Sequence, residues 1–414
     1  MGAISFSIEK KEGKARAGVL MTPHGPINTP AFIPVGTQAA VKGVHPEALR
    51  TLGTQVVLAN TYHLYLSPGE DVIKAAGGLG SFMNWKKADG TVAPTVTDSG
   101  GYQVFSLGRG MKRKITHITE EDKKGAEEGT SVFDSDVQSQ HGQLAVIDEE
   151  GVSFTSHVDG SLHRFTPERS IEIQHALGAD FFFAFDECTS PEEPYEYQKD
   201  AMFRTHRWAD RSLKAHKQNI GAWNAQGIYG IGQGGPFEDL RRESTKAIAS
   251  MGFDGFGLGG SFSKARGQSM LPLALACLEE LPPEMPVHGL GVGEPTDVLE
   301  AIAAGADTFD CVEPTRRARH GAIYTRRGLV NLTNEKYLSD QGPLDPETII
   351  PGTEGFTRAY ISHLLRSGEF LGYAIASLHN LGFITGLVAG AREAILSGTF
   401  AEYRESFLRD YRGS

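Results

Sequence analysis

The stretch Phe182-Phe183-Ala184-Phe185-Asp186-Glu187-Cys188 is a short apolar run that ends in a carboxylate and then turns polar. Val96-Thr97-Asp98-Ser99-Gly100 and Thr308-Phe309-Asp310-Cys311 repeat this pattern. Proteins of the α/β class place reactive groups at the carboxyl ends of buried strands, because the strand is rigid and the next loop leaves room for a substrate. An aspartate after a strand can also be a helix N-cap or a turn residue. Three such aspartates predict one polar pocket that contains Asp98, Asp186 and Asp310.

Five more apolar runs end in polar or glycine-rich turns, so the chain has eight candidate strands. They lie at 31–35, 56–60, 95–98, 181–186, 228–233, 255–260, 287–291 and 308–310, and helical patterns lie between most of them, at 167–177, 198–217, 237–251 and 295–304. Strands that alternate with helices in this way predict an α/β protein with a parallel (β/α)8 TIM barrel and functional groups on its C-terminal face. A doubly wound sheet is the competing architecture.

The barrel is expected at residues 31–320, between two appended regions. Residues 1–30 alternate and break at glycines, which predicts N-terminal antiparallel hairpins. Residues 321–414 are expected to form a mostly helical C-terminal subdomain packed against the barrel, with helices near 358–366, 378–396 and 402–411. A charged insertion at about 108–146 is expected to be a solvated loop, with a nucleic-acid contact as the alternative.

Composition limits the function. The chain has 414 residues, of which 40% are hydrophobic, and its formal charge of −11 gives no global attraction to nucleic acid or anionic membranes. Any phosphate binding must therefore come from a local basic patch. The three cysteines, Cys188, Cys277 and Cys311, are too few for a disulfide framework and fit a reducing cytosol. No signal peptide and no apolar run of membrane-spanning length is evident, so we expect a cytoplasmic protein without a membrane partner.

Two glycine-rich turns need an interpretation of their own. Gly232-Gln233-Gly234-Gly235 and Gly289-Leu290-Gly291-Val292-Gly293 could cradle nucleotide phosphates, but neither completes a dinucleotide or P-loop signature. Close backbone packing is the favoured explanation, and we expect no cofactor.

The ordered motifs of the chain resemble those of the tRNA-guanine transglycosylases, or queuine tRNA-ribosyltransferases, and the bacterial type more than the archaeal. The matching segments are 60–64, 98–103, 156–161, 167–170, 185–189, 232–235, 257–260, 291–293, 309–312, 314–316 and 343–346, which together span nearly the whole chain apart from the insertion. The resemblance implies a TIM barrel that exchanges a guanine in tRNA for a 7-deazaguanine, such as preQ1 or queuine, at the anticodon wobble position.

The resemblance also implies roles for the two outer aspartates. Base exchange that retains configuration needs a nucleophile at the anomeric carbon and a separate acid and base for the purines, which is the logic of a retaining glycosidase. By motif position, Asp310 is expected to be the nucleophile that forms a covalent ribosyl intermediate. Asp98 is expected to be the general acid and base, oriented by Asn60.

The same resemblance implies the residues that contact the substrates. Asp186 would accept hydrogen bonds from the base, Gln233 and the Gly260 N–H would face its carbonyl edge, and Tyr102 would stack on it. Cys188 and Leu290 complete this substrate-binding set, with Cys188 and Cys311 expected to be small buried side chains rather than reactive thiols. Arg316 and Arg319 match tRNA-contacting arginines of the family, the alternative being a solvated basic turn.

The chain departs from the family at its structural zinc site. That site uses Cys-x-Cys-x-x-Cys and a later histidine, whereas Thr348, Ile350 and Thr353 occupy the cysteine positions here and only His379 remains. One imidazole cannot hold a structural zinc, so we expect no metal. Because the zinc region of the family supports dimer contacts, a homodimer is an open possibility.

The base pocket departs as well. Ser261, Ser263 and His288 stand where bacterial members usually have Leu, Val and Tyr. These changes are expected to make the wall of the pocket more polar, so that the accepted base can differ from preQ1.

Three hypotheses remain open at this point. The first is an active transglycosylase, for which both Asp98 and Asp310 are present, with a DNA-directed relative as a variant. The second is a non-catalytic tRNA-binding partner subunit, which would be expected to have lost a carboxylate. The third is a nucleoside-directed hydrolase that uses the same two carboxylates with water as the acceptor.

Overall fold

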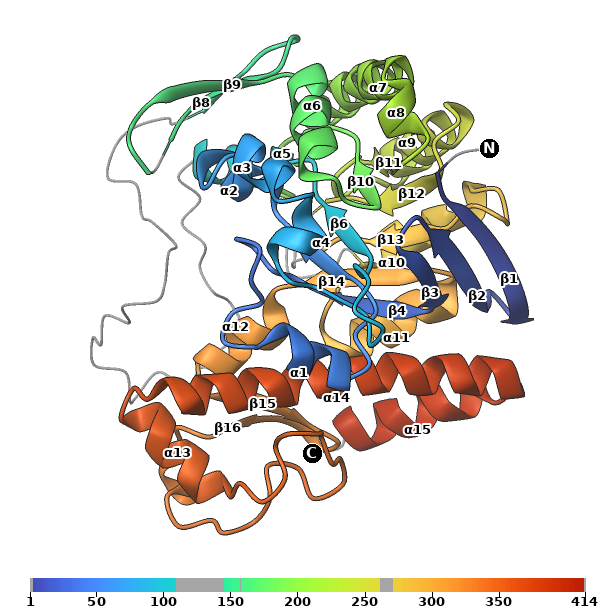
Figure 1. Ribbon diagram of the computed structural model, residues 1–414. Helices are drawn as coiled ribbons and strands as arrows, with labels where there is room; N and C mark the ends of the chain where they lie inside the picture. Colours follow the sequence, from blue (N-terminus) through green and yellow to red (C-terminus); the bar gives the residue numbers. More distant parts are fainter. Residues whose placement is uncertain (1–2, 109–144, 157, 261–270, 413–414) are drawn as a thin grey trace.

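The computed structural model describes residues 3–108, 145–156, 158–260 and 271–412. Its centre is a parallel sheet of eight strands in the order β4-β14-β13-β12-β11-β10-β6-β5 (Figure 1). These are β4 (Ala31–Pro34), β5 (Val57–Ala59), β6 (Thr95–Thr97), β10 (Phe181–Phe183), β11 (Gly227–Gly232), β12 (Gly255–Leu258), β13 (Val287–Gly289) and β14 (Thr308–Cys311). All eight predicted strands are confirmed.

The two ends of this sheet meet, which makes it a barrel. A parallel bridge joins Val35, just after β4, to Leu58 in β5, and the Gly36 N–H donates to the Leu58 carbonyl at 2.6 Å. The closure excludes the doubly wound sheet. Phe181 and Phe183 belong to one buried cluster and Phe182 to another, as expected for a strand that is covered on both faces.

Helices cover the outside of the barrel. The four predicted ones are confirmed as α6 (Pro167–Leu177), α7 (Tyr195–Gln218), α9 (Glu238–Ser250) and α11 (Pro295–Ala304). Shorter ones are α1 (Pro46–Thr51), α2 (Thr61–Leu66), α3 (Glu70–Ala75), α4 (Leu79–Phe82), α5 (Gly101–Gly108), α8 (Ile220–Trp223), α10 (Leu271–Ala276) and α12 (Glu313–Arg319), with 3-10 turns at Cys277–Glu280 and Glu335–Tyr337. Local sequence signals set the two ends of α6: the Thr166 side chain caps its start, and Gly178, at φ 68°, ends it.

The N-terminal residues form an antiparallel sheet of three strands, β1 (Ser5–Glu12), β2 (Ala15–Thr22) and β3 (Gly25–Thr29). This confirms the predicted hairpins. A buried ion pair fixes the sheet to the barrel, since Arg16 Nε in β2 donates to Asp307 Oδ1, just before β14, at 2.8 Å.

A second antiparallel sheet was not predicted. It consists of β7 (Ala145–Ile147), β8 (Val152–Thr155) and β9 (Leu162–Phe165), and in Figure 1 β8 and β9 project from the barrel beside α6. The predicted charged insertion at about 108–146 lies mostly outside the described residues. Its last residues belong to β7.

The C-terminal region contains helices α13 (Arg358–Arg366), α14 (Phe370–Ser397) and α15 (Phe400–Arg412), which confirms its helical character. Helix α14 begins at Phe370, earlier than the predicted 378. A hairpin of β15 (Ala322–Thr325) and β16 (Gly328–Asn331) was not predicted. The domain boundaries at 30 and 320 stay predictions.

Helix α14 corrects one statement from the sequence. With 28 residues it is long and apolar enough to cross a membrane by length and composition, although we expected no such run. In the structure 67% of its most apolar stretch is buried, and it packs against α12, α13, α15 and β15 (Figure 1). The helix is largely apolar because most of it is covered by protein, as core helices are.

Candidate active site

Asp98 lies directly after β6, and a set of donors holds its carboxylate. Its Oδ1 accepts from the Thr61 N–H at 2.8 Å and the Gly100 N–H at 3.2 Å. Its Oδ2 accepts from Asn60 Nδ2 and from Gln103 Nε2, the latter at 2.9 Å. Asn60, at the end of β5 and the start of α2, is therefore in contact with Asp98 as the sequence predicted.

The pKa of Asp98 is raised above its usual value. Burial is the largest cause, and the negative charge of Asp310 adds to it, whereas the hydrogen bonds from Asn60, Thr61 and Gln103 act in the opposite direction. A carboxyl group with this balance holds a proton more readily than an exposed aspartate does. The two aspartates also lie near enough for the charge of one to affect the other.

Asp186 follows β10 and is buried. Its Oδ1 accepts from Ser99 Oγ at 2.8 Å, and its Oδ2 accepts from Gln233 Nε2 at 2.7 Å. Burial raises the pKa of Asp186 to about 6, with a further contribution from the negative charge of Asp98. The structure thus brings the three predicted aspartates together at one end of the barrel.

Gln233 and Gly260 stand at the ends of the neighbouring strands β11 and β12. Gln233 Nε2 donates to Asp186. The other amide atom of Gln233, Oε1, is buried and has no hydrogen-bond partner among the described residues. Gly260 has φ 105°, and a Cβ there would lie 3.6 Å from Gln233 Oε1 and 2.7 Å from Arg241 Nη2. The two predicted residues are therefore neighbours, and a side chain at Gly260 would collide with Arg241.

Arg241 is a residue that the sequence analysis missed. It lies on α9, and its guanidinium donates from Nε to the Gly235 carbonyl at 2.6 Å and from Nη1 to the Gly259 carbonyl at 3.1 Å. Burial lowers its pKa to about 10, which leaves it charged at neutral pH. Arg241 ties together the turns after β11 and β12. Close backbone packing, as the sequence predicted, explains why residue 234 is a glycine, because a Cβ there would lie 2.7 Å from the Arg241 backbone nitrogen.

Asp310 lies in β14 with its side chain 13% exposed. Its Oδ1 accepts from the Gly291 N–H at 3.2 Å and lies 3.0 Å from His288 Nε2. His288 is fully buried and faces Asp310, and the expectation that it makes the base pocket wall more polar stays a prediction. Ser261 and Ser263, the other two departures in the pocket, lie outside the described residues.

The remaining predicted base contacts lie on nearby elements. Tyr102 is at the start of α5, with its side chain 39% exposed, and is thus accessible to a base. Cys188 is half-buried and lies close enough to Arg241 to interact with its charge. Leu290 packs against the cluster inside the barrel.

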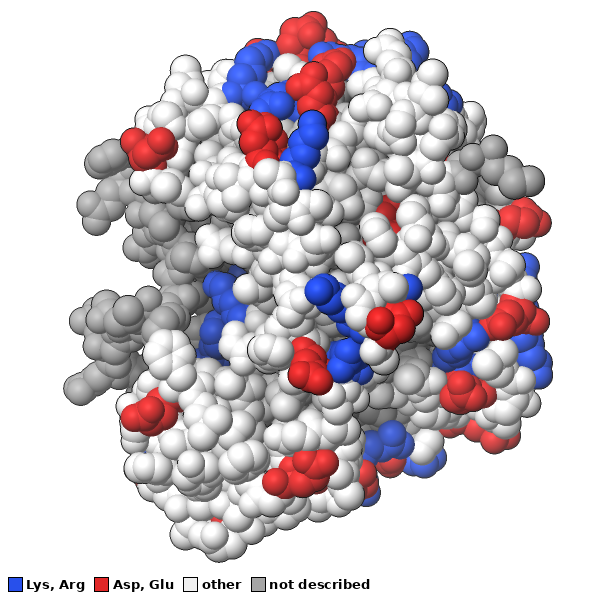
Figure 2. Space-filling model, viewed as in Figure 1, with Lys and Arg blue, Asp and Glu red and all other residues white. Residues whose placement is uncertain are grey.

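Helix α12 places its arginines next to the proposed nucleophile. Arg316 and Arg319 are half-buried, whereas Arg317 is held in ion pairs with Glu294 at 3.1 Å and Glu313 at 2.9 Å. Figure 2 shows Lys and Arg side chains in a hollow at the place that α12 occupies in Figure 1. A local basic patch therefore exists on a chain whose net charge is negative.

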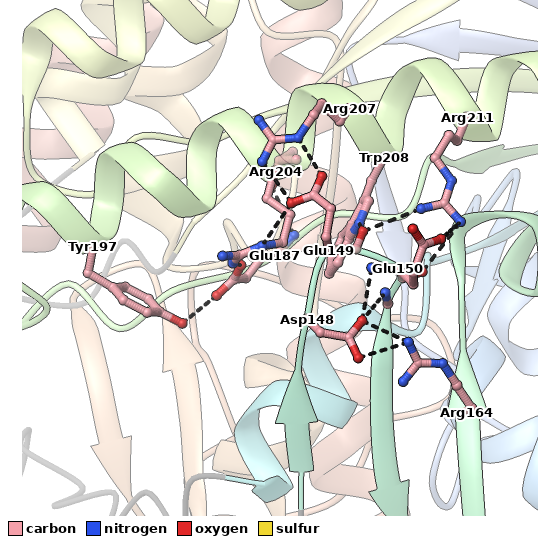
Figure 3. Close-up of polar contacts among 12 residues, drawn as sticks. Asp148, Glu149, Glu150, Arg164, Glu187, Tyr197, Arg204, Arg207, Trp208 and Arg211 are labelled. Carbon is pink, nitrogen blue, oxygen red and sulfur yellow. Dashed lines mark hydrogen bonds and ion pairs between the residues drawn. The ribbon is translucent and has the colours of Figure 1, made fainter.

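An ion-pair network that sequence reasoning missed joins the turn between β7 and β8 to α7 and to Glu187 (Figure 3). The turn between β7 and β8 docks on α7, where Arg207 Nη2 donates to Glu149 Oε2 at 2.9 Å. Arg204 lies 3.9 Å from the same carboxylate and also pairs with Glu187, which accepts from Tyr197 Oη at 2.6 Å. Glu187 follows Asp186 directly and is itself almost fully buried. The network thus links the β7-β8-β9 sheet to the end of β10, where Asp186 lies.

Comparisons with known proteins identify the family of the chain. The chain matches the family model described as queuine tRNA-ribosyltransferase over residues 11–127 and 128–413. Proteins named queuine tRNA-ribosyltransferase from Fusobacterium nucleatum and Caldanaerobacter subterraneus are 41% identical to it over 412 and 416 residues. The one from Desulforamulus reducens is 42% identical over 408 residues, and the three matches cover 98–100% of this chain and 98–99% of those proteins. The chain therefore belongs to the queuine tRNA-ribosyltransferase family, the pentosyltransferases also called tRNA-guanine transglycosylases.

Proposed function

We propose that this protein exchanges the guanine at the anticodon wobble position of tRNA for a 7-deazaguanine, preQ1 or queuine, through a covalent ribosyl-Asp310 intermediate. The observation that carries the proposal is the pairing of two carboxylates with different surroundings at one end of the barrel. Asp98 is held by four donors and burial raises its pKa, while Asp310 presents a carboxylate bound through one oxygen.

The proposed reaction has two displacements. In the first, Asp310 forms a bond to the anomeric carbon as the bond from that carbon to guanine breaks, and Asp98 gives its proton to the departing purine. In the second, Asp98 takes a proton from the incoming base, which attacks the same carbon and releases Asp310. Two inversions restore the configuration, and the proton that left with guanine is replaced from the new base.

Base recognition is proposed to rest on Asp186, Gln233 and Gly260. An ionised Asp186 would accept from the N1–H and the exocyclic amine of the purine. Gln233 has one amide atom committed to Asp186, so the other atom and the Gly260 N–H face the rest of the purine edge. Tyr102 would stack on the flipped base, with Cys188 and Leu290 as the walls of the pocket.

Arg316 and Arg319 are proposed to bind tRNA phosphates next to the extruded nucleotide. A cytoplasmic location follows from a tRNA substrate and agrees with three cysteines that form no disulfide. We further propose a homodimer, in which a second subunit covers exposed apolar side chains of the C-terminal region such as Leu338 and Ile349.

We also propose that the C-terminal region is stable without zinc. The residues at the family's zinc positions do not fit a metal: Ile350 is buried, and Thr353 Oγ1 donates to the Ile350 carbonyl at 2.9 Å. His379 Nε2 donates to the Tyr324 carbonyl at 2.8 Å, and burial lowers the pKa of its imidazole. Within the described ranges, no group of three His, Cys, Asp or Glu residues could hold a metal ion. Apolar packing can replace a buried polar cluster without loss of stability.

Transfer of radiolabelled guanine into unmodified tRNA tests the proposal. We expect label in the tRNA with the wild-type chain and none with Asp310→Asn. A denaturing gel should show a protein-tRNA adduct for the wild type, and Asp98→Asn should impair exchange with the fold intact. Transfer to duplex DNA alone, or release of free guanine without incorporation, would instead indicate the DNA-directed or hydrolytic alternative. Full activity of either variant would contradict the proposed roles.

A further inference from the structure

His288 makes a contact that the proposed reaction has not yet used. It lies in β13, fully buried, with Nε2 3.0 Å from Asp310 Oδ1 and Nδ1 2.9 Å from Thr308 Oγ1. In the sheet His288 is paired in register with Thr308, and Thr308 and Asp310 point to the same face of β14 because they are two residues apart. One imidazole therefore bridges two side chains of the neighbouring strand.

The bridge works in either protonation state of the imidazole. If the ring is neutral, the Thr308 hydroxyl donates to Nδ1, which leaves the proton on Nε2 facing Asp310. If the ring is charged, both nitrogens carry protons and the hydroxyl accepts from Nδ1. In both cases Nε2–H donates to the Asp310 carboxylate.

These contacts distinguish the two oxygens of Asp310. Oδ1 receives the His288 N–H and the Gly291 N–H, and both donors fix it from the side of β13. A carboxylate held through one oxygen cannot turn freely about its Cβ-Cγ bond, so the other oxygen keeps one direction. The ring of His288 is itself held by Phe183, whose centroid lies 5.0 Å away.

We propose that His288 is a positioning residue for the nucleophile. It acts through Asp310: it holds Oδ1 so that Oδ2 forms the bond to the anomeric carbon, and Thr308 orients the imidazole. This inference rests on the proposed function, because it assigns the attacking atom of the same displacement. Correct alignment of a reacting atom lowers the barrier of the chemical step without altering the binding of the substrate.

The test compares four variants in single-turnover formation of the protein-tRNA adduct and in steady-state guanine exchange. His288→Leu removes the donor and should lower the adduct rate and kcat about 10- to 100-fold, the usual effect of losing one hydrogen bond to a charged group. KM for tRNA and for guanine should change less than about threefold. His288→Gln retains an N–H at the same reach and should restore most of the rate.

The other two variants separate positioning from packing. Thr308→Val keeps His288 but removes the hydroxyl that orients it, and should lower the adduct rate about 3- to 10-fold. It reports on the inference even if His288→Leu fails to fold. His216, also fully buried but on α7 and bonded to the Gln226 carbonyl, gives the control: His216→Leu should lower the melting temperature and leave the adduct rate unchanged.

Three outcomes would overturn the inference while leaving the proposed function in place. These are a wild-type adduct rate in folded His288→Leu, a loss that is equal in His288→Leu and His288→Gln, and a change confined to KM. Absence of label and adduct with the wild-type chain would overturn the proposed function and this inference together.

Discussion

Replacing Asp186 by asparagine should stabilise the protein at neutral pH and remove base exchange. Burial raises the pKa of this carboxyl from the usual 3.8 to about 6. Each pH unit corresponds to about 1.4 kcal/mol, so keeping Asp186 ionised in the folded protein costs about 3 kcal/mol at pH 8. An amide carries no charge and avoids this cost. Its oxygen can still accept from Ser99, and its nitrogen can donate to Gln233 Oε1 once that amide rotates.

The sign of the pH dependence follows from the raised pKa. Well below the unfolded pKa of 3.8 the carboxyl is protonated in both the folded and the unfolded chain, so the substitution should give no gain there, and at pH 4 the gain should still be small. The gain should grow as the pH rises from 4 to 6 and then stay constant. With an unfolding entropy of roughly 2.1 cal/mol/K per residue over 414 residues, about 3 kcal/mol corresponds to a melting temperature about 3 °C higher.

Thermal melts at pH 4 and pH 8, with guanine exchange measured on the same samples, check this expectation. Asp186→Asn should lower kcat/KM for guanine by about 10³-fold or more, because the site would lose its acceptor for the purine donors. Asp159→Asn is the matched control: that exposed carboxyl has its pKa lowered to about 2 by Ser161 and Ser156, so its loss should not stabilise. A melting temperature that is unchanged at pH 8, or a gain equal at both pH values, would refute the reasoning.

Three further expectations follow from the site. Arg316→Ala and Arg319→Ala should each raise KM for tRNA roughly 5- to 20-fold and weaken the dependence of KM on salt. Arg317→Ala breaks two ion pairs and should mainly lower the melting temperature. Equal effects of all three variants on KM would contradict this distinction. Treatment with a zinc chelator should leave the melting temperature and exchange unchanged, and stoichiometric zinc in the purified protein would disprove the metal-free proposal. Arg241→Met should raise KM for guanine about tenfold, and Arg241→Lys should not restore it, because only the guanidinium can reach both the Gly235 and the Gly259 carbonyls. Exchange kinetics of the two variants check this expectation.

The barrel was predictable because each of its strands is a short apolar run followed by a turn, and this signal is local. The β7-β8-β9 sheet was not, since Val152–Thr155 and Leu162–Phe165 are short and half-exposed, and their buried side chains pack in a cluster with residues of α2, α5 and α7. The start of α14 was missed for a related reason. Gly372 weakens the local helix signal, yet a Cβ there would lie 2.8 Å from Leu364 Cβ, so the contact between α13 and α14 requires it.

The site could be predicted only in part. Motifs located Asp98, Asp186 and Asp310, because strand ends carry a sequence signal of their own. The contact between His288 and Asp310 depends on the register of two strands, which no local pattern encodes. Arg241 did leave a trace: it lies on the buried face of α9 with Ser244 and Ile248, and a charged side chain on an otherwise buried helix face indicates a specific partner. A search of each predicted helix for a charged residue on its apolar face would have identified Arg241.

The electrostatic link between Asp98 and Asp310 supports the change of role that the proposed reaction requires of Asp98. While Asp310 is ionised, its charge raises the pKa of Asp98, which favours the protonated acid that the first displacement needs. Attack on the ribose turns Asp310 into a neutral ester and removes that charge. The ionised Asp98 that remains after guanine has taken the proton is then no longer opposed by a neighbouring carboxylate, and the four hydrogen bonds to its oxygens stabilise it as the base for the incoming purine. The same residue can therefore serve as acid and then as base without movement, because the covalent state of Asp310 changes its surroundings between the two steps.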